Sequence, residues 1–157
     1  MTALAYIALG ANLGDRAHNL NLALDKLRET PGVDVRTVST FMENPAVGGP
    51  AGAPPFLNAA AEVVTSLPPD MLLARLLEIE QELGRVRREK WGPRPIDLDL
   101  LLYGDHVLDI PGLTVPHPLM HQRRFVLAPL AEIAPEALHP VFQWTIEELL
   151  EDLDHPD

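Results

Sequence analysis

Short apolar runs that read as β-strands recur along the first two thirds of the chain. Residues 4–9 (LAYIAL) form such a run and end at Gly10, and residues 56–66 and 96–103 form two more. Residues 33–41 (VDVRTVSTF) alternate imperfectly between apolar and polar positions. Apolar runs of this length and a period of two are typical of strands, so the pattern predicts four of them.

Two segments between these strands have the spacing of amphipathic helices. The first follows Asp15, a plausible N-cap, and stops at Pro31-Gly32; the second opens at Pro68-Pro69-Asp70, with Ser66 as a possible cap, and stops at Gly84. Apolar residues three or four positions apart form one stripe on each helix. The stripes are Leu20, Ala23, Leu24 and Leu27, and Leu72, Leu76, Ile79 and Leu83.

The order βαββαβ predicts a single α+β domain over residues 1–157 with a mostly antiparallel sheet. Two long connections, 43–55 and 84–95, are rich in Pro, Gly or basic residues and are expected to be loops. The chain after Gly104 is rich in proline and closes with an acidic helix near 145–153.

The composition and charge of the chain exclude several classes of function. The chain has 157 residues, no cysteine and a formal net charge of −11. The lack of cysteine excludes disulfides and thiolate chemistry and suits a cytoplasmic protein. The negative charge argues against nonspecific binding to nucleic acid or anionic lipid, and no apolar run is long enough to span a membrane.

Two carboxylates, Asp97 and Asp99, interrupt the apolar stretch WGPRPIDLDLLLYG (91–104). On a strand they point to one face, while Leu98, Leu100 and Leu102 point to the other. Two like charges about 7 Å apart beside apolar residues repel each other unless a cation lies between them. Mg²⁺ bound together with phosphate oxygens suits such a pair, although a structural network with nearby arginines is an equally open alternative.

Basic residues gather just ahead of these aspartates. Five of the twelve Lys and Arg residues lie within ten positions: Arg85, Arg87, Arg88, Lys90 and Arg94. Arginine side chains neutralise charge on a transferring phosphoryl group, so this spacing favours an anionic ligand over a merely solvated basic loop.

Further candidates lie elsewhere in the chain. His117 could contact a phosphate or a base, or could be structural, and Arg123 and Arg124 add a smaller basic point. Phe56, Trp91 and Phe125 could sandwich a heteroaromatic ring, or fill the core. The chain contains no phosphate-binding P-loop, dinucleotide fingerprint or H-E-x-x-H motif.

Five ordered motifs resemble the 6-hydroxymethyl-7,8-dihydropterin pyrophosphokinase family of folate biosynthesis. They are YIALGANLGDR (6–16), FLNAAAEV (56–63), GRVR (84–87), KWGPRPIDLDLL (90–101) and TVPHPLMHQRRFVLAPLAEIAPE (114–136). The resemblance implies transfer of pyrophosphate from ATP to the reduced pterin, giving AMP and the pterin diphosphate, with two Mg²⁺ ions. It also implies a ferredoxin-like βαββαβ core with a C-terminal extension.

The resemblance implies roles for individual residues. Asp97 and Asp99 would be the metal ligands, and Arg85 and Arg94 would grip the triphosphate and assist transfer. The remaining ATP-binding candidates are Glu80, Arg87, Arg88, Thr114, His117 and Arg123. The pterin-binding candidates are Asn44, Pro45, Val47, Phe56, Asn58, Trp91 and Phe125. The chain departs from the family's usual pattern at Asn44-Pro45, where Thr-Pro is common, and at Phe56, where Tyr is frequent.

The sequence thus predicts a cytoplasmic, Mg²⁺-dependent pyrophosphokinase that uses ATP, without nucleic acid or membrane partners, as a monomer or weak dimer. The rival class is a ferredoxin-like binding module that holds a nucleotide or metal without turnover. Release of AMP only in the presence of the pterin distinguishes the two.

Overall fold

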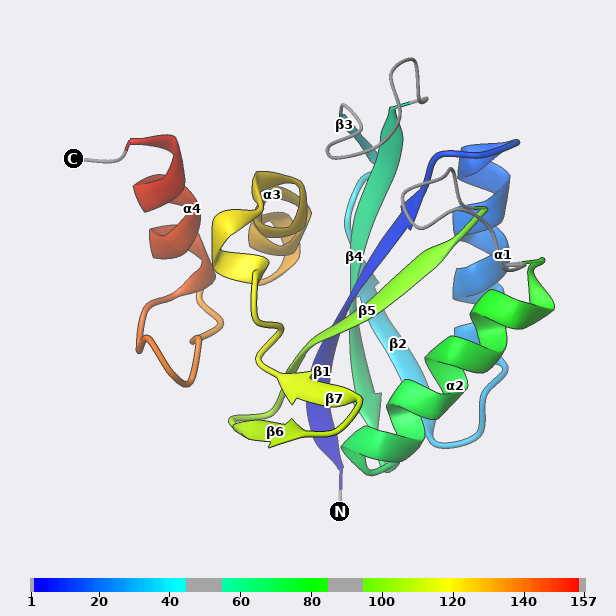
Figure 1. The fold of residues 1–157 in the computed structure, drawn as a ribbon, viewed down its shortest axis with the longest axis horizontal. Coiled ribbons are helices and arrows are strands. Elements are labelled where there is room, and N and C mark those ends of the chain that lie inside the picture. Colours follow the sequence, from blue (N-terminus) through cyan, green and yellow to red (C-terminus); the bar gives the residue numbers. More distant parts are fainter. Residues whose placement is uncertain (1, 45–54, 85–94, 156–157) are drawn as a thin grey trace.

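The computed structural model describes residues 2–44, 55–84 and 95–155. Its main sheet contains β1 (Ala3–Ala11), β2 (Val33–Val38), β4 (Phe56–Thr65) and β5 (Asp97–Tyr103) in the order β2-β4-β1-β5, and every neighbouring pair is antiparallel (Figure 1). A short strand, β3 (Met42–Asn44), also pairs with β4. This order confirms the predicted ferredoxin-like core with an antiparallel sheet.

The two predicted helices cover one face of the sheet (Figure 1): α1 (Arg16–Arg28) and α2 (Pro69–Glu82). Asp15 caps α1 as predicted, because its side chain accepts a hydrogen bond from the His18 N–H at 3.1 Å. Two details of the prediction are wrong. Pro68 rather than Ser66 is the N-cap of α2, and Leu83 lies just beyond the helix and is only half-buried.

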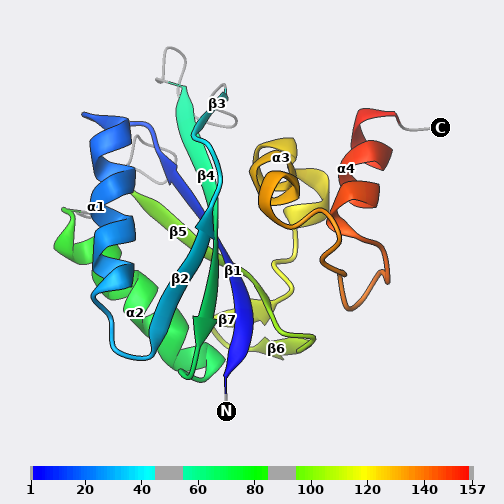
Figure 2. The same cartoon turned by 180° about the vertical axis from the view of Figure 1, so that it is seen from behind.

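The opposite face carries the C-terminal part of the chain (Figure 2). It contains the 3₁₀ turn η1 (Met120–Gln122), α3 (Arg124–Ile133) and α4 (Ile146–Asp154). Between β5 and η1 lies the hairpin of β6 (Leu108–Ile110) and β7 (Leu113–Val115), whose Leu113 and Val115 pack in the core under α1 and α2. The sequence predicted α4, whose N-terminus is closed by a capping box between Thr145 and Glu148. It did not predict the hairpin or α3, because prolines punctuate this region and Pro129 lies inside α3.

The strand predicted over residues 33–41 is shorter in the structure. β2 ends at Val38, and the chain then continues to β3, which lies beside the first residues of β4. Ser39 marks the break, since its N–H donates to the Ala60 carbonyl and its hydroxyl accepts from the Ala60 N–H. The segment therefore reaches the end of the sheet where β5 begins.

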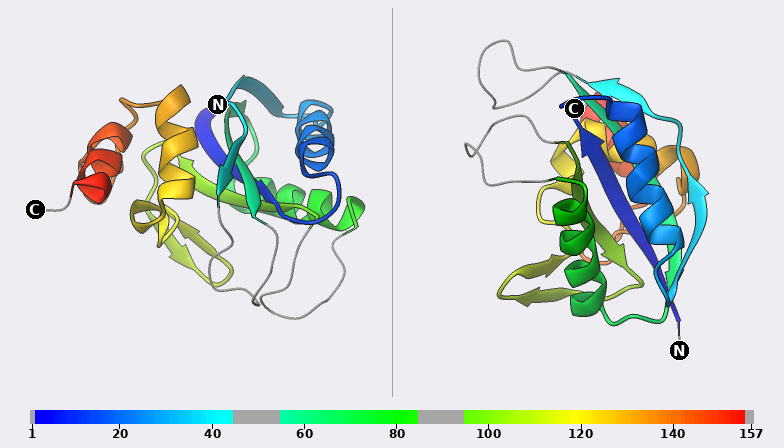
Figure 3. Two further views of the ribbon diagram at one scale, coloured as in Figure 1. Left: turned by 90° about the horizontal axis from the view of Figure 1, so that it is seen from above. Right: turned by 90° about the vertical axis from the view of Figure 1, so that its right-hand side faces the viewer.

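Each face of the sheet has its own apolar core. Figure 3 shows α1 and α2 on one side of the sheet and α3 and α4 on the other. The first lies under α1 and α2, with Ile7, Leu27 and Leu76 fully buried. The second lies under α3 and α4 and includes Met120, Leu127 and Ile146. Burial on both faces explains why the central strands are continuous apolar runs.

One expectation for β5 fails at a β-bulge. Leu100 lies opposite Ile7 but Leu102 lies opposite Tyr6, so Leu101 is the additional residue. As a result Leu101 and Leu102 both pack in the core under α3, and Tyr103 turns to the core under α1 and α2. Strict alternation had placed Leu102 with Leu98 and Leu100.

Candidate active site

The two aspartates lie at the start of β5, on the sheet face that α3 covers farther along. Asp97 is opposite Gly10 of β1 and Asp99 is opposite Ala8. Leu98 and Leu100, which point the other way, are buried in the core under α1 and α2. The alternation predicted for this end of the strand is therefore confirmed, and both carboxylates are half-buried.

Glu80 holds the backbone between the two aspartates. It projects from α2, is only 2% exposed, and its Oε2 accepts a hydrogen bond from the Leu98 N–H at 2.7 Å. A carboxylate that accepts from a backbone N–H satisfies a donor on the outer edge of β5, which is the last strand of the sheet on that side. Glu80, which the resemblance assigns to ATP, thus also fixes the strand that carries Asp97 and Asp99.

His117 lies next to this strand, after the hairpin. Its N–H donates to the Leu101 carbonyl at 2.9 Å, and its Nδ1 accepts from the Leu119 N–H at 3.3 Å. Burial and the nearby Arg123 guanidinium lower the pKa of His117, and the charge of Asp97 partly opposes them. The structure thus brings His117, Arg123 and Asp97 within electrostatic range of one another.

Asn58 and Asp97 lie in one row across the sheet, on either side of Gly10. Residues directly opposite in neighbouring strands share a face, and two strand spacings amount to about 10 Å. The Asn58 Oδ1 accepts a hydrogen bond from the Asn44 Nδ2 at 3.2 Å. A side chain on Gly10 would meet the Asn58 Nδ2 at 2.9 Å and the Phe56 ring at 3.5 Å. Asn44, Phe56 and Asn58 therefore gather beside the aspartates.

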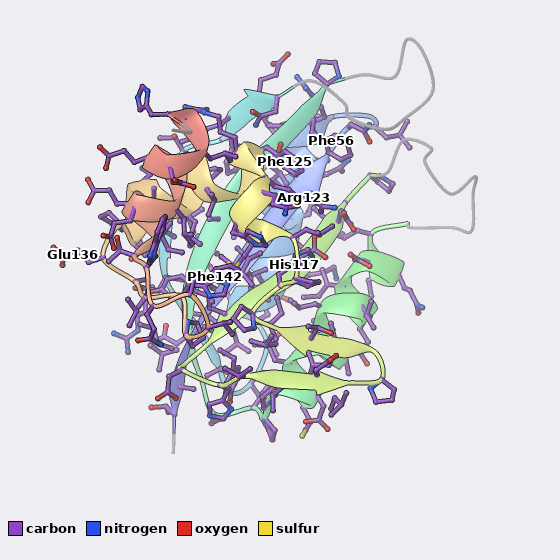
Figure 4. All side chains as sticks on the ribbon, turned by 60° about the vertical axis from the view of Figure 1, so that its left-hand side comes forward. Phe56, His117, Arg123, Phe125, Glu136 and Phe142 are labelled. Carbon is purple, nitrogen blue, oxygen red and sulfur yellow. The ribbon has the colours of Figure 1, made fainter. Side chains whose placement is uncertain are left out.

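Aromatic and basic side chains complete this side of the molecule. In Figure 4, Phe56, Phe125, Arg123 and His117 follow one another from the start of β4 toward the hairpin. The Arg123 guanidinium carbon lies 5.8 Å from the centroid of the Phe125 ring, a cation–π distance. Phe125 is half-buried in the first turn of α3, so its ring only partly belongs to the core.

Thr114 lies farther along the hairpin. It is exposed on β7, and its hydroxyl donates to Asp109 Oδ1 at 3.2 Å. In the part of the chain that the structure describes, no group of three or more His, Asp or Glu side chains is placed to hold a metal ion. Two carboxylates with further oxygens from a phosphate ligand are nevertheless a donor set that Mg²⁺ accepts.

Comparison with known proteins shows the family of this chain. Residues 6–135 match the model of the 7,8-dihydro-6-hydroxymethylpterin-pyrophosphokinase (HPPK) family. The chain belongs to the HPPK family. The matched region contains every site residue discussed above.

Curated HPPK relatives extend the match over nearly the whole chain. Three are named 2-amino-4-hydroxy-6-hydroxymethyldihydropteridine pyrophosphokinase. The one from Synechocystis is 45% identical over 150 residues, covering 96% of this chain and 76% of the relative. The one from Haemophilus influenzae is 41% identical, and the match covers 96% of this chain and 94% of the relative. The one from Bacillus subtilis is 48% identical, and the match covers 87% of this chain and 81% of the relative.

Solved structures show the same fold. The HPPK-DHPS chain of Plasmodium falciparum, wild type with pteroate, matches with a TM-score of 0.76 at 15% identity and covers 97% of this chain. Another, from an HPPK-DHPS complex with substrates, matches with a TM-score of 0.74. This chain spans less than half of those longer chains, 44% and 43%.

Several HPPK candidate residues lie outside the described residues. They are Pro45, Val47, Arg85, Arg87, Arg88, Trp91 and Arg94. Among the described residues near them in the sequence, Asn44 is on β3, Phe56 begins β4 and Asp97 begins β5. Their predicted roles remain predictions.

Sequence reasoning missed the position of Gly10 in this candidate site. It treated Gly10 as the end of the first strand, whereas β1 continues to Ala11 and Gly10 lies inside it. A glycine within a strand often marks a close approach of another group, and here that group is the Asn58 amide. Asn12, which follows β1 and is 3% exposed, is a second buried polar residue that the sequence did not single out.

Proposed function

We propose that this HPPK chain transfers the pyrophosphoryl group of ATP to the hydroxymethyl group of 6-hydroxymethyl-7,8-dihydropterin, giving AMP and the pterin diphosphate for folate biosynthesis. The observation that carries the proposal is the row Asn58–Gly10–Asp97. In this row the Asn58 amide, which can hydrogen-bond to the edge of a heterocyclic ring, lies about 10 Å from the carboxylate pair that would bind MgATP. The family match supports the reaction class, that of a transferase using ATP.

The donor set of Asp97 and Asp99 fits Mg²⁺. Both are half-buried carboxylates on one strand face, and the residues opposite them, Gly10 and Ala8, carry no bulky side chain. We propose that the pair holds two Mg²⁺ ions together with ATP phosphate oxygens. When bound, these ions would neutralise charge on the phosphates and supply Lewis-acid activation.

The chain's own cations would position the nucleotide. Arg85 and Arg94 are proposed to grip the triphosphate and to stabilise the negative charge that develops during transfer. His117 would act as a neutral hydrogen-bond donor, because its lowered pKa keeps it uncharged near pH 7 and its Nδ1 already accepts from Leu119, which leaves the proton on Nε2. The other proposed ATP contacts are Glu80, Arg87, Arg88, Thr114 and Arg123.

The pterin would lie between the aromatic walls. Asn58 can both donate to and accept from the ring edge, and its bond to Asn44 fixes the orientation of both amides. Phe56 and Phe125 are the proposed stacking partners. The remaining proposed contacts are Pro45, Val47 and Trp91. The hydroxymethyl oxygen would then attack the β-phosphorus in line, with AMP as the leaving group.

The deciding assay follows AMP formation from ATP and Mg²⁺ with and without 6-hydroxymethyl-7,8-dihydropterin. We expect AMP only in the presence of the pterin, and binding of both ligands without any AMP would instead favour a binding module. Asp97→Asn and Asp99→Asn should each lose turnover while retaining the wild-type circular dichroism spectrum. Asp105→Asn, an exposed turn residue after β5, is the matched control and should keep activity. Normal kinetics in both site variants would remove the metal assignment.

We further propose that the enzyme acts in the cytoplasm as a monomer or weak dimer on small-molecule substrates. The charge of −11 supports the absence of a nucleic-acid partner. The described residues contain no helix with the length and apolar character that crossing a membrane requires. Sedimentation analysis over a range of protein concentrations tests the oligomeric state.

A further inference from the structure

The strand that carries Asn44 has little support of its own. β3 consists of three residues, Met42, Glu43 and Asn44, and pairs with β4. Asn44 lies opposite Phe56, and the chain just before β3 leaves β2 at Val38. A two-stranded pairing of this length is marginal by itself. The position of the proposed pterin-binding wall therefore depends on contacts from other elements.

Arg16 makes one such contact from the first turn of α1. Its Nη1 donates to the Pro55 carbonyl at 2.7 Å, and its Nη2 donates to Glu43 Oε2 at 3.2 Å. Pro55 and Glu43 are the immediate chain neighbours of Phe56 and Asn44. A single planar guanidinium thus joins the two strands next to the pair of side chains proposed to touch the pterin.

Glu132 makes a second contact from the last turns of α3. Its Oε1 accepts from the Thr40 N–H at 2.6 Å and its Oε2 accepts from the Thr40 hydroxyl at 2.8 Å. These two bonds lower the pKa of Glu132, so the carboxylate is charged at neutral pH. Thr40 is two residues before β3, and α3 carries Phe125 in its first turn. The contact therefore ties the helix that bears one aromatic wall to the strand opposite it.

We propose that Arg16 and Glu132 are positioning residues for pterin binding: together they fix β3 between α1 and α3 and so set the arrangement of Asn44, Phe56 and Phe125. The inference rests on the proposed function, because it assumes that these three side chains bind the pterin. Both contacts are exposed at the surface, where ion pairs and hydrogen bonds add little to global stability. Their effect should therefore be local, on the pterin and not on ATP.

The test compares Arg16→Ala and Glu132→Ala with wild type at saturating MgATP. Each is expected to raise the pterin KM about tenfold, the equivalent of one or two hydrogen bonds, and to leave the ATP KM within about twofold. Arg16→Lys and Glu132→Gln retain part of each contact and should show intermediate values. Arg36→Ala is the control, because Arg36 pairs with Asp34 on β2, away from β3; its pterin KM should equal that of wild type.

A direct binding measurement separates this inference from the proposed reaction. The pterin is titrated into protein saturated with Mg²⁺ and a non-hydrolysable ATP analogue. Weaker pterin binding in both alanine variants, with thermal unfolding close to wild type, supports the inference even if turnover were absent. Equal pterin binding in wild type and both variants overturns it, as does an equal loss of ATP and pterin affinity. A wild-type protein that does not bind the pterin overturns it as well, together with the assignment of the pterin site.

Discussion

Gly10→Ala adds one methyl group at the centre of the proposed site. The added Cβ would lie 2.9 Å from the Asn58 Nδ2 and 3.5 Å from the Phe56 ring. Gly10 is in a regular strand between β4 and β5, so alanine can adopt its backbone conformation. The perturbation is therefore one of space alone, and it acts on the two side chains proposed to hold the pterin.

The expected loss of stability follows from the short distance between the added Cβ and the Asn58 Nδ2. Carbon and nitrogen atoms pack at about 3.5 Å or more, so the Asn58 amide must move by roughly 0.5 Å. Asn58 is 7% exposed and hydrogen-bonded to Asn44, which leaves little room for the movement. Overpacking of this kind costs about 1–3 kcal/mol, and the displaced amide loses hydrogen bonds to the ligand worth about 1 kcal/mol each. For a domain of this size, a loss of about 1–3 kcal/mol in unfolding free energy lowers the Tm by about 2–12 °C.

The assay measures the Tm by circular dichroism and the pterin KM at saturating MgATP. We expect a Tm lower by several degrees and a pterin KM at least fivefold higher, with the ATP KM nearly unchanged. Gly112→Ala is the control. Gly112 has a φ of +82° and no atom within 4 Å of an added Cβ, so alanine should reduce stability through backbone strain without changing the pterin KM. An unchanged Tm and pterin KM in Gly10→Ala would refute the reasoning.

Three further variants test other parts of the site. Arg94→Ala should lower kcat more than it weakens ATP binding, and isothermal titration beside steady-state kinetics would show the reverse if Arg94 only binds. Glu80→Ala removes the acceptor of the Leu98 N–H and should lower the free energy of unfolding by about 1–3 kcal/mol. It should also raise the Mg²⁺ concentration needed for half-maximal activity. Glu80→Gln should behave nearly as wild type in both urea unfolding and Mg²⁺ titration. Burial and the nearby His121 lower the pKa of the His139 side chain in the folded protein. His139 therefore binds a proton more readily in the unfolded chain, and the free energy of unfolding should fall as the pH drops from 6.5 toward the pKa of His139 in the folded protein. His139→Asn, which offers an oxygen in place of Nδ1 to the backbone N–H groups of Val141 and Phe142, should flatten that dependence in urea unfolding between pH 7.5 and 5; an identical slope would exclude His139 as its source.

The elements that the sequence predicted correctly have a strong local signal. Strands β1, β4 and β5 are apolar runs because the sheet is covered on both faces, and α1 has both its cap and its stripe in the sequence. The hairpin β6–β7 and helix α3 lack such a signal. α3 is nearly all apolar and contains Pro129, so its helical state depends on packing against β4 and α4, which the sequence does not display.

The candidate site was predictable where its residues are close in sequence. Asp97 and Asp99 are two positions apart on one strand, and the alternation of a strand is enough to place them on one face. Their neighbours are distant in sequence: Asn58 reaches the row through β4 and Gly10 through β1. Register decides which residues share such a row, and register depends on pairing across the whole sheet. Contacts such as Arg16 to Glu43, or Glu132 to Thr40, cannot be predicted from spacing for the same reason.

The bulge in β5 affects both the core of the fold and the candidate site. Because Leu101 is an additional residue opposite β1, Leu101 and Leu102 both contribute to the core under α3, where strict alternation would supply only one of them. The same Leu101 accepts the hydrogen bond from the His117 N–H through its carbonyl. β5 therefore carries Asp97 and Asp99 at one end, while its bulge anchors the segment that leads from His117 to Arg123 and Phe125. Two features of one strand, an alternation that the sequence predicts and a bulge that it does not, thus position Asp97 and Asp99 and hold His117.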